Sequence, residues 1–448
     1  MPDEPRPAFV PLWPVCERVD GCIGIVVHDG ACLGHLGDQL DDYLDGLRPG
    51  DALEARGAVV TAVLVNRVLD RVKYGRTVPG TIALEHAEII GDDSRFELID
   101  FNGDVSCSWA RFAGSVRFNH SRFHQHVSFD NATFASTAQF ENVQVTGELR
   151  FVNARFEKRA RFGPLRASGL DLDGVRCAAM TEIDVQVERL TCRRARFEEG
   201  VVIRANDGAV FVEQARFGAP SLISGIRVMP RLSSLRQTEV NNLELADVDL
   251  RLCVFAGAYR LDQLRLAGRC PFDRPPRGWW TRRRTIVEEH VWRKWPTDRP
   301  DYWHLYPADP ERMANVYRSL RKAFEDSKFE AGAGDFYYGE MEMRRHSAET
   351  PHAERWILTV YWLLSGYGQR AARAIAALVL VIVVVGVLLA LWGQPAGDAA
   401  RIAVGAVVLR EPGAELTEAG QWTVMVARVL GPVLLALAVL AVRARVKR

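Results

Sequence analysis

Residues 110–162 read ARFAGSVRFNHSRFHQHVSFDNATFASTAQFENVQVTGELRFVNARFEKRARF, and within them one apolar position returns at alternating steps of six and five residues. A small or apolar residue stands two places before each return. The returning residues are Phe112, Phe118, Phe123, Phe129, Phe134, Phe140, Val145, Phe151, Phe156 and Phe162. These steps match neither the period of a helix (about 3.6 residues) nor that of a flat strand (about 2). They predict a solenoid, in which each unit buries its apolar side chain by stacking on the next.

We interpret each unit as one side of a roughly square coil. Positions i and i+2 of an extended segment share a face, so the returning residue and the residue two before it both point inward. The polar residues between them face water and turn the corner. Alternating units of five and six residues give about 22 residues per turn, and the repeat is long enough for roughly seven or eight turns.

The repeat continues on both sides of this stretch. It becomes more aliphatic and less regular after residue 162, lapses near 220–238, and returns after residue 240. We assign the structural ladder of the solenoid to Phe96, Phe101, Phe112, Phe118, Phe123, Phe129, Phe134, Phe140, Phe151, Phe156, Phe162, Leu245, Leu250 and Phe255.

The units around residues 243–255 resemble the pentapeptide-repeat family. Leu243-Glu-Leu245, Val248-Asp-Leu250 and Cys253-Val-Phe255 look like its ordinary five-residue form, and residues 112–162 look like a Phe-rich variant with interleaved six-residue units. The resemblance implies a right-handed quadrilateral β-helix. Residues 317–322 (YRSLRK) and 335–345 (DFYYGEMEMRR) are similar to the segment that joins repeats and membrane spans in membrane-anchored, actinobacterial-type members.

Two segments near the C-terminus are apolar enough to cross a bilayer. Residues 374–392 contain no charged residue, and residues 422–442 contain only Arg428. Nineteen residues of helix span about 29 Å, close to the thickness of a bilayer core. Basic residues at 370, 373 and 443–448 flank the pair on one side, and acidic residues are concentrated in the loop between them. The positive-inside rule therefore predicts a multi-pass protein of the plasma membrane with both termini in the cytoplasm.

Changes in composition predict five segments. We expect a helical N-terminal cap at 1–80, the β-helix at 81–270, a Trp/Arg-rich connector at 271–306, a helical hairpin and juxtamembrane segment at 307–370, and two transmembrane helices at 371–448. The connector carries Arg282, Arg283 and Arg284 beside several Trp residues. Such a cluster could bind an anionic membrane surface or nucleic acid. We favour the alternative in which the aromatic side chains pack the C-terminal end of the β-helix while the arginines stay solvated.

The sequence contains no recognisable catalytic or cofactor-binding motif, so we expect neither catalysis nor a cofactor. Cys16, Cys22 and Cys32 are separated by six and ten positions without a C-x-x-C, which does not predict a metal site. We expect His35 to be a helix-end residue. The cluster of His120, His124 and His126 lies at solvent-facing positions, and no metal ion is expected there either.

The remaining prediction is a scaffold that binds a protein partner, and a homo-oligomer is compatible with it. Residues 101–220 contain 14 acidic and 16 basic residues, which argues against an acidic rod that mimics DNA, and the net charge of +1 gives no general preference for nucleic acid. We assign the candidate partner-binding face to the outward arginines Arg111, Arg117, Arg122, Arg155, Arg161 and Arg166. The alternative is a two-helix ion-channel-like pore subunit. Its loop, however, offers only Ala403-Val404-Gly405 where a K⁺-selective filter would read T-V-G-Y-G.

Overall fold

The computed structural model describes residues 9–92, 94–276, 283–296, 309–411 and 416–446. The chain divides into two compact units, Met1–Asp273 and Arg274–Arg448, which we call the solenoid unit and the helical unit. Trp279, Trp280 and Trp303 of the predicted connector lie outside the described residues.

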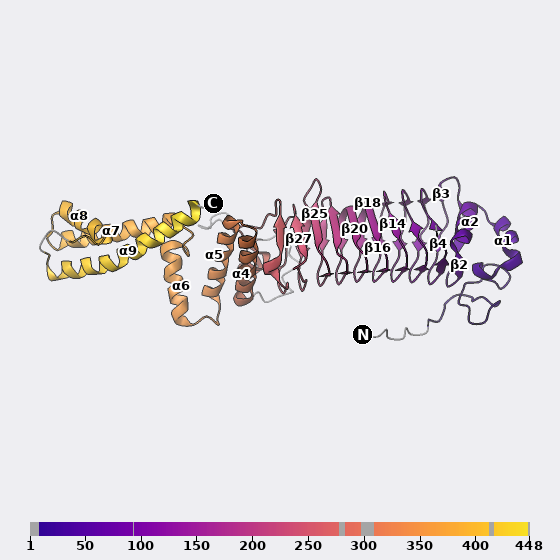
Figure 1. The fold of residues 1–448 in the computed structure, drawn as a ribbon, viewed down its shortest axis with the longest axis horizontal. Helices are drawn as coiled ribbons and strands as arrows, with labels where there is room; N and C mark the ends of the chain where they lie inside the picture. Colours follow the sequence, from indigo (N-terminus) through magenta and orange to yellow (C-terminus); the bar gives the residue numbers. More distant parts are fainter. Residues whose placement is uncertain (1–8, 93, 277–282, 297–308, 412–415, 447–448) are drawn as a thin grey trace. The chain divides into compact units, whose positions relative to one another are not determined.

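The solenoid unit is a parallel β-solenoid of about nine turns, slightly more than the sequence predicts (Figure 1). Most of its strands join one sheet: β1 (Leu53–Glu54), β3 (Thr77–Val78), β4 (Ile82–Ala83), β6 (Ser94–Arg95), β7 (Asp100–Phe101), β8 (Val105–Ser106), β10 (Val116–Arg117), β11 (Arg122–Phe123), β12 (Val127–Ser128), β14 (Ala138–Phe140), β15 (Gln144–Val145), β16 (Glu148–Arg150), β18 (Ala160–Asp171), β20 (Thr181–Thr191), β22 (Val201–Ala205), β23 (Ala209–Phe211), β25 (Ser221–Gly225), β26 (Arg231–Ser234), β27 (Leu243–Ala246) and β28 (Arg265–Ala267). The long strand β18 pairs with β14, β15 and β16, so it follows successive sides of the coil.

A second sheet forms one side of the coil by itself. Its strands are β2 (Val59–Thr61), β5 (Glu88–Ile90), β9 (Arg111–Phe112), β13 (Thr133–Phe134), β17 (Arg155–Phe156), β19 (Arg176–Cys177), β21 (Arg196–Phe197) and β24 (Arg216–Phe217). Neighbouring strands are parallel throughout. This second sheet therefore places one residue of every turn in a straight line along the solenoid.

The pairing register gives the length of each turn directly. Phe112 pairs with Phe134 and Phe134 with Phe156, which are steps of 22 residues. Cys177 pairs with Phe197, and Phe197 with Phe217, which are steps of 20. The period of 22 matches alternating units of five and six residues, whereas 20 corresponds to four units of five.

The ladder side chains form stacked columns in the interior. All fourteen ladder residues are at most 2% exposed. Phe96, Phe118, Phe140 and Phe162 stack in one column with ring centroids 4.8, 5.1 and 5.2 Å apart. Neighbouring columns meet edge to face, as where Phe118 contacts Phe129 at 76°. This spacing follows from the strand separation of about 4.8 Å, and offset or edge-to-face geometry is the favoured arrangement of aromatic pairs.

Helical elements precede and interrupt the first turns. They are η1 (Leu33–His35), η2 (Gly37–Gln39), α1 (Leu40–Gly46) and α2 (Ala62–Val72). Thr61 caps α2, because its Oγ1 accepts a hydrogen bond from the N–H of Leu64 at 3.2 Å. The first parallel pair joins Leu53 to Ile82, so the solenoid begins within the predicted segment 1–80 and its first strands alternate with these helices. The short helix η3 (Leu261–Gln263) precedes the last strand.

The helical unit contains α3 (Val287–Arg293), α4 (Pro310–Asp326), α5 (Glu330–His346), α6 (His352–Ser365), α7 (Ala371–Leu391), α8 (Ala396–Val407) and α9 (Glu418–Val446). Helix α4 begins with Pro310 at its first turn and an Asp309 cap, whose side chain accepts from the N–H of Glu311. Helices α4 and α5 pack as a hairpin around Tyr317. A Cβ at Gly339 would lie 2.7 Å from the Tyr317 ring, so the glycine lets α5 approach α4 closely.

Helices α7 and α9 are long and apolar enough to cross a membrane, by length and composition. The qualifying segments are Ala371–Leu391 and Glu418–Val442. Most of their apolar side chains point outward, where a soluble protein would bury them. The connection between them contains α8, which packs on both helices through Ala399, Ile402, Ala403 and Ala406. Figure 1 shows α8 folded back beside α7.

Candidate functional site

The six outward arginines do not form one surface. Arg111 and Arg155 lie on the second sheet, two turns apart in register. Arg117 and Arg161 align through Gln139, and Arg122 and Arg166 align through Gln144, in two other lines of the coil. The predicted partner-binding face is therefore divided among three lines of the coil, and partner binding by these arginines stays a prediction. Residues five or six apart belong to successive sides of the coil, so 111, 117 and 122 point in different directions.

Half of these arginines are already paired with carboxylates. Arg111 contacts Glu88 at 3.5 Å and Glu157 at 3.8 Å, and Arg161 contacts Glu141 at 3.0 Å. Arg117 lies 3.8 Å from Glu97. Among the described residues, no carboxylate lies within ion-pair distance of the other three, Arg122, Arg155 and Arg166.

The second sheet carries an uninterrupted line of four arginines that the sequence reasoning missed. Arg155, Arg176, Arg196 and Arg216 pair directly with one another in consecutive turns, and we call them the arginine column. Each stands between two buried residues, in the triplets Ala154-Arg-Phe156, Val175-Arg-Cys177, Ala195-Arg-Phe197 and Ala215-Arg-Phe217. The triplet at steps of 21, 20 and 20 residues was the available signal. The apolar ladder alone does not reveal the column, because each arginine occupies the outward position between two inward residues.

The arginine column concentrates positive charge. All four side chains are exposed, and within the described ranges none has a carboxylate at ion-pair distance. Adjacent strands are about 4.8 Å apart, and two unit charges at that distance repel by about 1 kcal/mol even in bulk water. On the same line Glu239 directly follows Arg216, whereas Thr133 precedes Arg155 and Glu88 lies beyond Arg111. A partner that places carboxylates along the column would relieve this repulsion.

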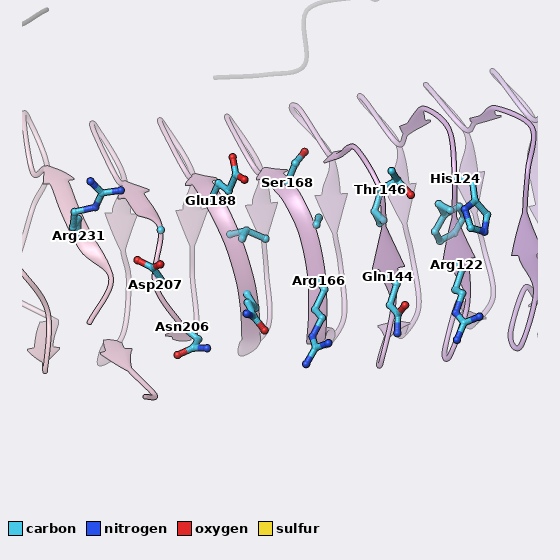
Figure 2. A pocket seen from close by; sticks show the side chains of 16 residues that line it. Arg122, His124, Gln144, Thr146, Arg166, Ser168, Glu188, Asn206, Asp207 and Arg231 are labelled. Atoms are coloured by element: carbon cyan, nitrogen blue, oxygen red, sulfur yellow. The ribbon is translucent and has the colours of Figure 1, made fainter. Parts of the chain in front are cut away.

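A groove of about 760 Å³ runs along another line of the coil (Figure 2). Arg122, Gln144, Arg166 and Gln186 lie in register along it. Its other labelled residues include the acidic Glu188 and Asp207. The charges of this groove are mixed, so it favours an anionic partner less than the arginine column does.

The His cluster remains spread over the coil surface. His120 has a left-handed backbone (φ 59°) at a corner, and His124 lines the groove of Figure 2. These two and His126 do not converge on a common point in a metal-binding group.

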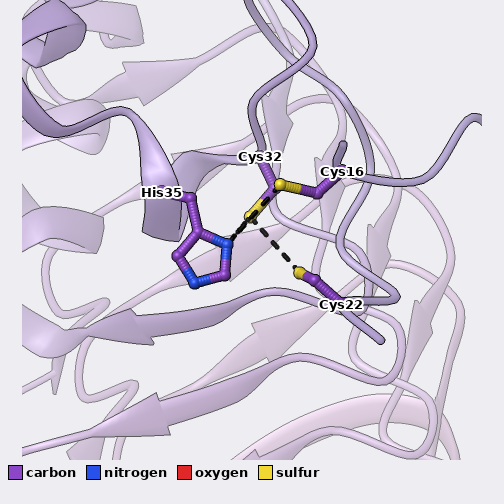
Figure 3. A group of neighbouring side chains, drawn as sticks. All are labelled: Cys16, Cys22, Cys32 and His35. Atoms are coloured by element: carbon purple, nitrogen blue, oxygen red, sulfur yellow. Dashed lines mark hydrogen bonds between the residues drawn. The ribbon is translucent and has the colours of Figure 1, made fainter. Parts of the chain in front are cut away.

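One group of side chains that could hold a metal ion does occur in the part of the chain that the structure describes. Cys16, Cys22, Cys32 and His35 place one ligand atom each within 4.8 Å of one another (Figure 3). Burial opposes ionisation of Cys16, but hydrogen bonds from the backbone at Cys32 and Arg18 and from the His35 ring lower its pKa to about 6. Burial raises the pKa of Cys32 to about 12. The sequence reasoning dismissed both the cysteines and His35. The spacing Cys32-x-x-His35 was the signal, because histidine can replace the second cysteine of a C-x-x-C pair.

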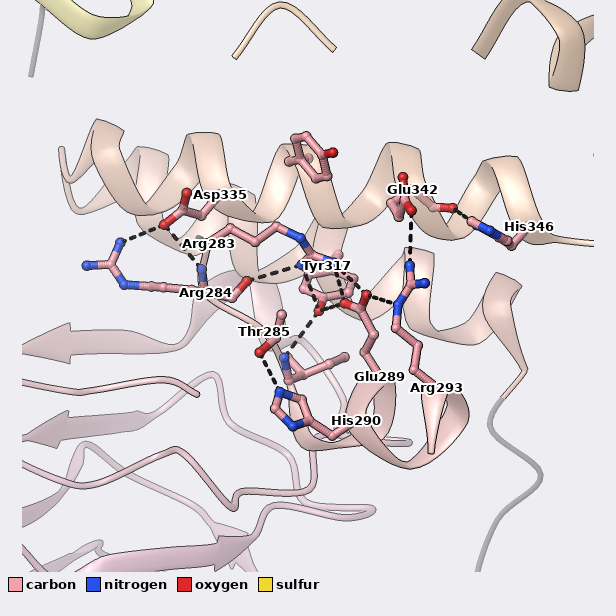
Figure 4. A network of polar contacts seen from close by, with 12 residues as sticks. Arg283, Arg284, Thr285, Glu289, His290, Arg293, Tyr317, Asp335, Glu342 and His346 are labelled. Carbon is pink, nitrogen blue, oxygen red and sulfur yellow. Dashed lines mark hydrogen bonds and ion pairs between the residues drawn. The ribbon is translucent and has the colours of Figure 1, made fainter. Parts of the chain in front are cut away.

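The helical unit contains a buried charged network around Glu289 (Figure 4). Arg283 is 4% exposed and pairs with Glu289 at 2.5 Å, and Arg293 pairs with the same carboxylate at 2.7 Å. The hydroxyl of Tyr317 donates to Glu289 Oε2 at 2.5 Å. Burial opposes the charge of Glu289, but Arg283 and Arg293 outweigh it and lower the pKa of this carboxyl to about 2. The prediction that the connector arginines stay solvated is wrong for Arg283 and Arg293.

A second carboxylate extends this network to α5 and the segment after α6. Glu342 accepts from Arg293 at 3.0 Å, from Arg345 at 2.9 Å and from the Tyr367 hydroxyl at 3.0 Å. Arg284 lies 3.5 Å from Asp335 at the other end of α5. Glu289 on α3 accepts from Tyr317 on α4, and Arg293 on α3 donates to Glu342 on α5, so the network holds α3, α4 and α5 together.

Comparison with protein-family models, with curated proteins and with solved structures finds no match for this chain.

Proposed function

We propose that this protein is a membrane-anchored scaffold whose solenoid binds an acidic protein partner along the arginine column. The observation that carries the proposal is the alignment of Arg155, Arg176, Arg196 and Arg216 in consecutive turns without a paired carboxylate in the described ranges. A rigid stack presents these charges at a fixed spacing. The conformational entropy of this surface is therefore already lost when the solenoid folds, so less entropy is lost when a partner binds.

The two apolar helices support the membrane anchor. Helices α7 and α9 would cross the plasma membrane, with both termini in the cytoplasm because basic residues flank the pair and acidic ones occupy the loop. Labelling of single cysteines placed near residues 370 and 410 tests this topology. Reagents that cannot cross the membrane should reach only the position near 410 in intact cells.

We further propose that the solenoid is a right-handed quadrilateral β-helix of the pentapeptide-repeat kind. Turns of 20 and 22 residues support four units per turn. Left-handed corner residues at 98, 109, 120, 131, 142 and 153 recur every eleven residues, which supports equivalent alternate corners. An experimental structure of the full chain would test both the hand and the number of sides.

Charge reversal of the arginine column tests the partner-binding function. Arg176→Glu/Arg196→Glu should reduce co-purification of protein partners from detergent-solubilised membranes by about tenfold or more, since close charge pairs across an interface contribute strongly to binding. Arg122→Glu/Arg166→Glu is the matched control, because it changes the net charge equally at unpaired arginines on another line of the coil. Nuclease treatment should not alter the result. Equal recovery of the same proteins with both variants would contradict the proposal.

One observation favours the alternative function of a pore subunit. Helix α8 packs against both spans, as a re-entrant helix would, and Gly431 lets α9 approach it because a Cβ there would lie 2.7 Å from the Cα of Val407. The loop lacks the T-V-G-Y-G pattern, so any conductance would use another chemistry. Purified protein in planar bilayers should show discrete currents if this function holds. Their loss in a variant with Ala403→Trp would assign them to α8.

A further inference from the structure

The cysteine–histidine cluster lies outside the surfaces that the proposed function uses. Its four residues come from 20 consecutive positions with the spacing C-x5-C-x9-C-x2-H. Antiparallel bridges fold this segment: Val15 pairs with Ile25, and His28 with Ala31. His35 ends the short helix η1, which Cys32 directly precedes. Turns that are separated in the sequence thus bring three sulfurs and one imidazole nitrogen to within 4.8 Å of one another.

The distances between the ligand atoms fit a tetrahedral zinc site. Zinc lies about 2.3 Å from sulfur and about 2.0–2.1 Å from nitrogen, so tetrahedral edges should be about 3.8 Å between sulfurs and about 3.6 Å between sulfur and nitrogen. The Sγ atoms of Cys22 and Cys32 are 3.9 Å apart. Nδ1 of His35 lies 3.5 Å from the Cys16 Sγ and 3.4 Å from the Cys32 Sγ. Figure 3 shows the His35 ring turned with this nitrogen toward the sulfurs.

The backbone around the cluster donates to each sulfur in the same way. The N–H of Gly24 points at the Sγ of Cys22 at 3.4 Å. The backbone N–H groups of Cys32 and Arg18 lower the pKa of Cys16, and that of Gly34 opposes the rise that burial causes in the pKa of Cys32. Each sulfur thus has one donor two places after its cysteine, and Cys16 has a second donor at Cys32. Such N–H groups stabilise thiolates and orient metal ligands, and a thiol packed merely as an apolar core residue does not require them.

Two glycines hold the loops at the distance that the cluster requires. A Cβ at Gly24 would lie 2.8 Å from the Cys32 Sγ, and a Cβ at Gly34 would lie 2.1 Å from the backbone oxygen of Val59. Because Gly24 has no Cβ, the Cys32 sulfur can lie close to the other sulfurs. The missing Cβ of Gly34 allows the segment around η1 to pack against β2. The N–H of Ile25 also donates to the backbone oxygen of Arg56 at 2.8 Å.

We propose that Cys16, Cys22, Cys32 and His35 bind one Zn²⁺ ion in a structural site that fastens the N-terminal segment to the first turn of the solenoid. Thiolate and imidazole donors suit zinc, and four protein ligands leave no open position for catalysis. In the zinc-bound site the three cysteines are thiolates, and His35 binds in its neutral form through Nδ1. The ion would replace a hydrophobic core in a segment of only 20 residues, and the segment it holds covers the free edge of β2.

Metal content of the full chain tests this site. Protein purified in detergent and reducing buffer without chelator should contain about one zinc per chain by elemental analysis. Cys32→Ser should lower zinc affinity by at least tenfold, whereas the control Cys270→Ser, at a half-buried free cysteine elsewhere in the solenoid unit, should retain the zinc. Equal zinc content in the two variants would overturn the proposal.

Cobalt substitution keeps the test independent of variants that fail to fold. Chelated wild-type protein reloaded with Co²⁺ should show the intense visible bands of a tetrahedral site and a thiolate charge-transfer band. Weak bands typical of six oxygen or nitrogen ligands would overturn the assignment. So would freshly purified wild-type protein without metal in which mass spectrometry finds Cys22 and Cys32 joined by a disulfide.

Discussion

The solenoid unit buries its side chains in the same arrangement in turn after turn, whereas the helical unit has an interior arrangement that occurs only once in it. In the solenoid, Phe112, Phe134 and Phe156 occupy equivalent positions, and each ring contacts a copy of itself in the next turn. In the helical unit, the interior around Tyr317 contains ionised groups that satisfy one another only in one arrangement. Repeated apolar stacking therefore distributes stability over many similar contacts, whereas a buried ionic network concentrates stability in a few.

The largest expected effect is in the helical unit. Glu289→Ala leaves Arg283 buried without its carboxylate and should destabilise the unit by about 3–5 kcal/mol, the usual cost of breaking a buried ion pair. Denaturant unfolding followed by tryptophan fluorescence should detect the change. Hydrogen exchange should localise it to α3–α5 and leave the solenoid protected.

Glu325→Ala is the matched control for this prediction. Glu325 pairs with Arg321 on the same helical hairpin, but its side chain is 55% exposed. An exposed ion pair contributes about 0–1 kcal/mol, so the control should unfold nearly as the wild type does. If the two variants lost equal stability, the contrast between buried network and apolar ladder would be mistaken.

A ladder truncation should have a similar or slightly smaller effect, confined to the solenoid. Phe134→Ala removes a ring that stacks on Phe112 at 5.0 Å and on Phe156 at 4.6 Å, and it leaves a cavity that the rigid coil cannot close. The expected cost is about 3–4 kcal/mol of unfolding free energy. Thr133→Ala, at the outward neighbour in the same strand, should change stability by less than about 0.5 kcal/mol. Hydrogen exchange that rises across the whole chain in Phe134→Ala would show that the two units do not unfold separately.

The sequence predicted the solenoid better than the helical unit for a physical reason. A stacked coil repeats its pattern, so each Phe at a step of five or six predicts the next, and the register of Phe112 with Phe134 follows from that spacing. The helical hairpin was also predictable, from the apolar stripe of α4 and its Asp309–Pro310 start. The burial of Arg283 was not, because its partners Glu289 and Tyr317 lie on elements whose packing no local pattern encodes.

The binding groups were predicted less well than the fold. Outward residues were grouped by their closeness in sequence, but a coil separates Arg111 from Arg117 and aligns Arg155 with Arg176. The sequence did not predict the cysteine cluster because its ligands are brought together by two turns, one at Gly21 and one at Gly30. Both glycines have positive φ. In both cases the residues that lie side by side in space are distant or irregularly spaced in the sequence.

Acid should affect the two units differently. The Glu289 carboxyl has a folded-state pKa of about 2, below its ordinary value of about 4.3 in an unfolded chain. The network therefore stabilises the helical unit fully above about pH 5, and this contribution is lost as the pH falls toward 2, to a total of about 3 kcal/mol. Denaturant unfolding at several pH values should show this loss for the helical unit, and Glu289→Gln should flatten it. A solenoid that lost as much stability over the same range would contradict the assignment.

The smallest expected effect is at a corner of the solenoid and should be stabilising. Leu98 has a left-handed backbone with φ 60°, which costs a branched residue about 1–2 kcal/mol but is tolerated by asparagine. The equivalent corner at Asn142 has φ 55°. Because Leu98 is 50% exposed, Leu98→Asn loses little burial and should raise the unfolding free energy of the solenoid by about 0.5–1 kcal/mol. The reverse change, Asn142→Leu, should lower it by a similar amount. If thermal unfolding moved in the same direction for both, the corners would not be equivalent, and the regular geometry attributed to this unit would fail at the positions where the chain turns.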